Sequence, residues 1–86
     1  MSIKIMQKKT HWSSYDLNIA AVAITLGHEL VEIERDAHPN KGLFVFKHSN
    51  DLLKIVDNYY SDRLKINPRI LLDTLKLLKN RLHASA

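Results

Sequence analysis

The stretch LVEIERDAHPNKGLFVFK, residues 30–47, decides the fold class of this chain. In its first part Val31 and Ile33 alternate with glutamates, which predicts a half-buried strand with these two side chains on one face. Glu32 and Glu34 share the opposite face. A run of turn formers, DAHPNKG, follows, and LFVFK then has the composition of a second, more central strand. The stretch therefore predicts a β-hairpin with a long connecting loop.

Capping residues mark one helix on each side of this hairpin. Two serines and Asp16 offer oxygens to free helix amides, and the apolar run that follows predicts a buried helix over about 15–26. Gly27 comes next, where a residue without a Cβ can end a helix with positive φ. After the hairpin, a second capping cluster precedes apolar residues at helical spacing. This pattern predicts a helix over about 50–60.

A third helix begins at Asn67-Pro68, because asparagine caps free amides and proline fits the first helical position. We expect it to run to about residue 82. Its leucines recur at the spacing of one helix face, and polar residues take the other face. The predicted core stripe is Leu71, Leu75, Leu78 and Leu82, and the opposite side carries Arg69, Asp73, Lys76 and Asn80.

These elements predict a single small α+β domain over residues 1–86, with the hairpin packed against three helices. The element order is (β)-α-β-β-α-α. Two alternatives remain for the bracketed strand, since residues 1–12 could form an extra edge strand or a loose tail.

Composition narrows the function classes. The 86 residues include no cysteine, which excludes disulfides, thiolate metal sites and cysteine nucleophiles. Neither a signal peptide nor a membrane-spanning run is present, so we expect a cytoplasmic protein that does not insert into membranes.

Charge is unevenly distributed along the chain. Residues 61–86 carry six basic and two acidic side chains, whereas residues 11–60 carry four basic and seven acidic ones.

An ordered set of motifs resembles an uncharacterised family of short bacterial and phage proteins that is defined as a domain of unknown function. The motifs, in chain order, are SYDL with AA at 14–21, GHEL at 27–30, FVF at 44–46, NP at 67–68 and LKLLKNR at 75–81. The resemblance covers about residues 13–82. Asn67 and Asn80 stand where the family pattern has Asp and Ser. The family has no agreed activity, so the resemblance transfers no functional residue.

Nothing in the sequence assembles into a catalytic or cofactor site. The five histidines lack the i,i+4 or compact spacing of metal ligands. With two glycines in the chain there is no glycine-rich phosphate loop, and no nucleophile is paired with a base. We therefore expect a protein that is not an enzyme and that uses no cofactor or metal.

Two surfaces remain as candidate binding sites. Arg69, Lys76 and Lys79 fall on one broad side of the third helix and predict a basic surface for an anionic partner, such as nucleic acid or a nucleoprotein complex. The alternative is an acidic hairpin surface formed by Glu32, Glu34 and Asp36, which would suit a phage-type inhibitor or adaptor that binds another protein.

Self-association is a further expectation. Ile70, Leu72 and Leu77 are apolar but lie beyond the core stripe of the third helix. A homodimer would cover this surplus apolar surface.

Overall fold

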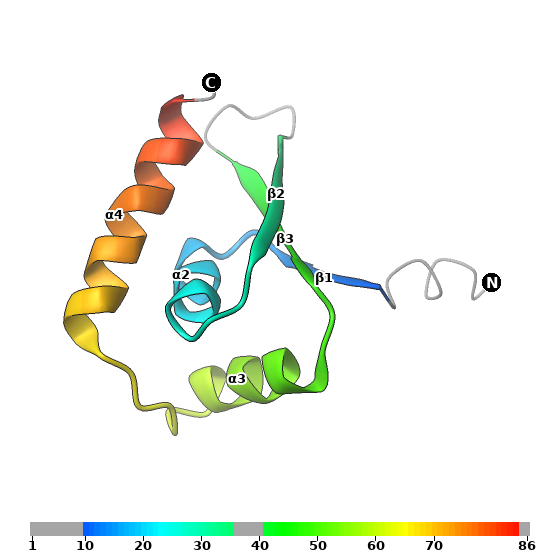
Figure 1. Ribbon diagram of the computed structural model, residues 1–86, viewed down its shortest axis with the longest axis vertical. Helices are drawn as coiled ribbons and strands as arrows, with labels where there is room; N and C mark the ends of the chain where they lie inside the picture. The colour runs from blue at the N-terminus through cyan, green and yellow to red at the C-terminus, as the bar shows by residue number, and fades with distance from the viewer. Residues whose placement is uncertain (1–9, 36–40, 85–86) are drawn as a thin grey trace.

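The computed structural model describes residues 10–35 and 41–84. Three strands and three helices follow one another in the predicted order (Figure 1). They are β1 (His11–Ser14), α2 (Leu17–Thr25), β2 (Leu30–Arg35), β3 (Gly42–Lys47), α3 (Asn50–Tyr60) and α4 (Pro68–Ala84). The prediction of a small α+β domain is confirmed. No helix within the described residues has both the length and the apolar character needed to cross a bilayer.

The sheet is antiparallel, and its strand order is β1-β3-β2, so β3 is central as expected. β1 is an edge strand, one of the two alternatives for residues 1–12, although it begins only at His11. Residues 1–9 lie outside the described residues. Trp12 in β1 pairs with Phe46, and Ile33 in β2 pairs with Phe44. Since paired residues of neighbouring strands share a face, these four side chains lie on the core side of the sheet.

A β-bulge in β2 corrects one prediction. Leu30 pairs with Phe46 and Glu32 pairs with Val45, so Val31 is an extra residue in the ladder. Val31 is 51% exposed, whereas Leu30 and Ile33 pack against the core. The expectation that Val31 and Ile33 share the buried face was therefore wrong, because the bulge breaks the strict alternation on which it rested.

α2 forms the centre of the core. Ala20, Ala21 and Ala23 are fully buried, and they belong to the same core cluster as Phe44 and Phe46. α2 also contacts α3 and α4 (Figure 1). The predicted burial of this helix is thus confirmed.

Both short helices end in the same backbone motif. At the end of α2 the His28 amide donates to the Ala23 carbonyl at 2.9 Å, and Gly27 takes φ 99° as predicted. At the end of α3 the Arg63 amide donates to the Asn58 carbonyl at 2.9 Å, and Asp62 takes φ 60°. Asp62 thus holds a left-handed conformation that usually favours glycine.

α4 packs against α2 through its leucine stripe. Leu78 and Leu82 are buried, and Leu71 and Leu75 are partly buried against the same core. Asn67 caps the helix by accepting from the Ile70 amide at 3.1 Å. At the other end the Arg35 guanidinium donates to the Arg81 carbonyl at 3.2 Å, which ties α4 to β2.

Candidate functional surfaces

The three predicted cations of α4 are all exposed. Because each helical residue turns the chain by about 100°, Arg69 and Lys76, seven residues apart, differ by only about 20° around the axis. Lys79 lies about 60° further round. None of the three makes an ion pair within the described part of the chain. Their charges therefore face solvent unneutralised by direct contact.

The basic surface also contains other residue types. Asp73 is exposed one turn after Arg69, so the surface is not uniformly positive. Leu72, which is 62% exposed, lies between the directions of Lys76 and Lys79. All three cations are exposed, and none of them belongs to the predicted core stripe.

The two predicted acidic residues that the structure describes are brought together. Glu32 and Glu34 are exposed, and they pair with Val45 and Leu43 in β3. They lie on the sheet face opposite the core aromatics, along the edge strand β2. Asp36, the third predicted member of this surface, lies outside the described residues.

The aromatic residues mostly serve packing. The ring of Trp12 lies 6.1 Å from that of Phe46, and Tyr59 and Tyr60 meet edge to face at 4.9 Å. Tyr15 is 53% exposed, and the Lys41 ammonium lies 5.5 Å from its ring centroid. This last contact is within the range of a cation–π interaction.

Tyr60 also links two helices. Its hydroxyl donates to Asp16 Oδ2 at 3.1 Å, while Asp16 Oδ1 accepts from the Asn18 amide and caps α2. Loss of surrounding water raises the pKa of Tyr60, and the hydrogen bond to Asp16 and the charge of that carboxylate raise it further. The neutral phenol is thus the form that the folded chain favours.

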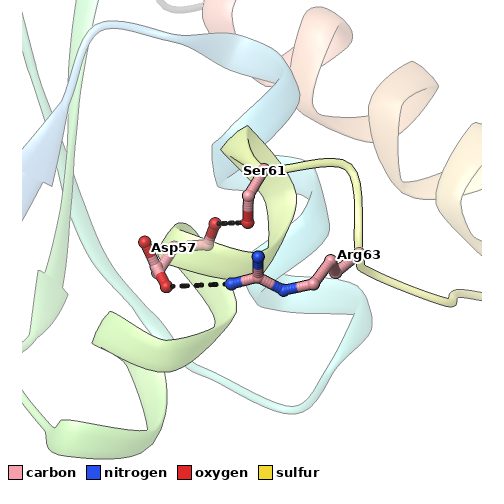
Figure 2. A network of polar contacts seen from close by, with 3 residues as sticks. All are labelled: Asp57, Ser61 and Arg63. Carbon is pink, nitrogen blue, oxygen red and sulfur yellow. Dashed lines mark hydrogen bonds and ion pairs between the residues drawn. The ribbon is translucent and has the colours of Figure 1, made fainter.

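The turn between α3 and α4 contains a small polar network (Figure 2). Arg63 pairs with Asp57 at 3.5 Å, and the Ser61 hydroxyl donates to the Asp57 carbonyl at 2.6 Å. Both charged side chains are mostly exposed, so solvent screening leaves the pair a small contribution to stability. Arg63 therefore has an ion-pair partner, unlike Arg69, Lys76 and Lys79.

Sequence reasoning missed a gathering of histidines. His11, His28 and His48 line one open depression of about 630 Å³ at the end of the sheet, together with Glu29, Lys47 and Ser49. They come from three separate segments, so no sequence spacing could have joined them. No group of three or more histidine or carboxylate side chains in the described residues is placed to hold a metal ion.

Comparison with known proteins identifies the chain at the level of a family. Residues 9–84 match the family described as Domain of unknown function (DUF5659). The chain belongs to this family. The match spans every element from β1 to α4, so both candidate surfaces lie inside the DUF5659 region. The expected resemblance to an uncharacterised family is thereby confirmed. Neither the curated proteins nor the solved structures include a match to this chain.

Proposed function

We propose that this DUF5659 protein is a non-enzymatic accessory protein that binds nucleic acid through the basic outer face of α4. The observation that carries the proposal is the exposure of Arg69, Lys76 and Lys79 on one broad side of a helix, without ion pairs among the described residues. From Arg69 to Lys79 the helix rises about 15 Å, at about 1.5 Å per residue.

Nucleic acid suits this surface because its phosphates form a regular row of negative charges. Cations that contact several phosphates release counterions, and this release supplies much of the sequence-independent affinity. The three side chains provide charge and hydrogen-bond donors but no paired acid and base, which suits binding rather than catalysis.

Fluorescence anisotropy with a labelled oligonucleotide tests this proposal. The combined variant Arg69→Gln, Lys76→Gln and Lys79→Gln should bind more weakly at low salt, and the slope of log K against log salt should flatten by up to about 3. The matched control is Lys47→Gln, Lys54→Gln and Lys65→Gln, which removes equal charge from other exposed positions. Equal losses in both variants, or no binding by the unchanged protein at low salt, would contradict the proposal.

A second candidate function is binding to a basic protein surface through Glu32 and Glu34, in the manner of a phage-type inhibitor or adaptor. Its support is that both carboxylates are exposed side by side on one face of an edge strand. Capture of a partner by the unchanged protein and by the Gln variant of α4, but not by Glu32→Gln with Glu34→Gln, would favour this candidate over nucleic acid.

The proposed setting is the cytoplasm of a bacterium or of a phage-infected cell. A cysteine-free chain suits a reducing compartment, in which disulfides contribute nothing. Cell fractionation of a tagged copy tests the location.

Self-association belongs to the same proposal. Ile70, Leu72 and Leu77, the residues expected to be surplus to the core, are 50%, 62% and 64% exposed. Burial of such side chains against a second copy would remove apolar surface from water.

A further inference from the structure

The depression at the end of the sheet gathers three histidines that the proposed function does not use. His11 begins β1, His28 follows α2 and His48 follows β3. The volume of the depression is about 630 Å³, which is typical of sites for small molecules. Its lining residues in the described part of the chain include none from α4. The depression is therefore a candidate site separate from the basic surface.

Backbone contacts hold the three segments around the depression. His11 pairs with Lys47 across β1 and β3. The His48 amide donates to the Thr10 carbonyl at 3.1 Å, and the His28 amide donates at 2.9 Å to a carbonyl near the end of α2. The backbone of the site is thus in place before a ligand binds, which lowers the entropy cost of binding.

The imidazole rings keep nitrogen atoms available to a ligand. His11 Nδ1 lies 3.0 Å from the Thr10 hydroxyl, and this contact does not use Nε2 of the ring. Within the part of the chain that the structure describes, the side chains of His28 and His48 make no hydrogen bond or ion pair. Nor are the described histidines placed to hold a metal ion. Their nitrogens are therefore available as hydrogen-bond donors to an anion.

The histidines set the sign of the charge in the depression. The charged and titratable side chains that line it are His11, His28, Glu29, Lys47 and His48. Lys47 and Glu29 carry opposite charges that cancel in the sum, although they form no ion pair with each other. Imidazole gains a proton as pH falls from about 8 to about 5, and each proton adds one positive charge. The depression is therefore close to neutral at pH 8 and cationic at pH 6.

We propose that this depression binds a small anion that carries a phosphate group, and that binding strengthens as pH falls from 8 to 6. A phosphate monoester offers three strong acceptor oxygens and a charge of about −1.5 to −2 at pH 7. Protonated imidazoles and the Lys47 ammonium supply charged donors, and hydrogen bonds between charged groups are stronger than those between neutral ones. The volume leaves room for an organic group attached to the phosphate.

Sulfate is a suitable first probe, because it stays fully ionised at pH 6 and at pH 8. Any pH dependence of its binding then comes from the protein. NMR titrations should show binding about tenfold tighter at pH 6 than at pH 8. The carbon-bound imidazole protons of His11, His28 and His48 should shift on addition of sulfate, whereas those of His83 on α4 should not. No binding at pH 6, equal affinity at the two pH values, or shifts confined to α4 would overturn the proposal.

His48→Gln and His83→Gln form a matched pair of variants, since both histidines are exposed and each variant removes one imidazole. His48→Gln should weaken sulfate binding at pH 6 by about threefold and change it little at pH 8, because the lost charge exists only in the protonated ring. His83→Gln should change neither affinity. Circular dichroism verifies that both variants are folded. Equal losses from the two variants would show that sulfate does not bind in the depression.

Inorganic phosphate and glycerol phosphate distinguish the two sources of the phosphate group. Tighter binding of glycerol phosphate at pH 6 would identify a phosphorylated small molecule as the ligand, and equal affinities would identify free phosphate. Failure of both to bind would overturn the proposal. The site does not rest on the proposed function. The combined Gln variant of α4 should retain the site, and at pH 8 the uncharged depression leaves the anisotropy test of nucleic-acid binding unaffected.

Discussion

Gly42 shows how one residue can be fixed by neighbours that are distant in sequence. A Cβ at this position would lie 2.7 Å from the Ile33 side chain and 2.7 Å from the Leu82 side chain. We expect Gly42→Ala to destabilise the protein by about 1–3 kcal/mol, because β2 or α4 must shift to make room. Urea unfolding measures this change. An unchanged midpoint would mean that these side-chain ends move freely.

At Asp62 we expect a substitution to raise the stability of the protein instead of lowering it. Its φ of 60° is strained for a residue with a Cβ, and its carboxylate lies at the negative end of the α3 dipole. Asp62→Gly should therefore stabilise the protein by about 0.5–1 kcal/mol. Gly27→Ala is the matched reverse change at φ 99° and should destabilise it by about 1 kcal/mol. Thermal melts of both variants test these two expectations. Melting temperatures that shift in the same direction in both variants would contradict them.

Tyr60 makes stability depend on alkaline pH. Because folding raises the pKa of this phenol, its contribution to stability is fully present below the unfolded value of about 10 and is lost as pH rises through the folded value. Tyr60→Phe removes the hydrogen bond to Asp16 and this titration. The difference in unfolding free energy between the natural protein and Tyr60→Phe should therefore shrink above pH 10. A constant difference would show that the phenol does not titrate with unfolding.

These residues mark a limit of sequence reasoning. The positive φ of Gly27 follows from its position after an apolar helical run, and this local signal was sufficient. Asp62 carries no such signal, because aspartate is common in ordinary turns. The contact at Gly42 requires knowledge of where α4 ends in space, which no local pattern supplies.

At the scale of elements, α4 separates core leucines from exposed ones. Leu78 is 2% exposed, so Leu78→Ala should destabilise the protein by about 2–5 kcal/mol through the cavity that it leaves. Leu75 is only partly buried, and Leu75→Ala should cost less. Leu72→Ala, at 62% exposure, is the control and should change stability by less than about 0.5 kcal/mol. Chemical denaturation ranks the three variants, and a different order would refute the assignment of the stripe.

The elements themselves were largely predictable because capping and periodicity are local. α3 spans residues 50–60 as expected, since Ser49 accepts from the Leu52 amide at its start. α2 begins two residues later than expected because Asp16 is its cap. The bulge at Val31 was not predictable, because it depends on how β2 pairs with β3 rather than on the alternation within β2.

At the scale of the whole molecule, the candidate surfaces were predictable only in part. The exposure of Arg69 and Lys76 follows from the helix period, which places them opposite the core stripe, whereas Lys79 lies at the border of that stripe. The depression lined by His11, His28 and His48 does not, because the sheet topology brings its segments together. The exposed apolar residues of α4 are an intermediate case. Ile70, Leu72 and Leu77 were visible in the sequence as residues beyond the core stripe, but the separation of Leu72 from Ile70 and Leu77 depends on the direction of the core.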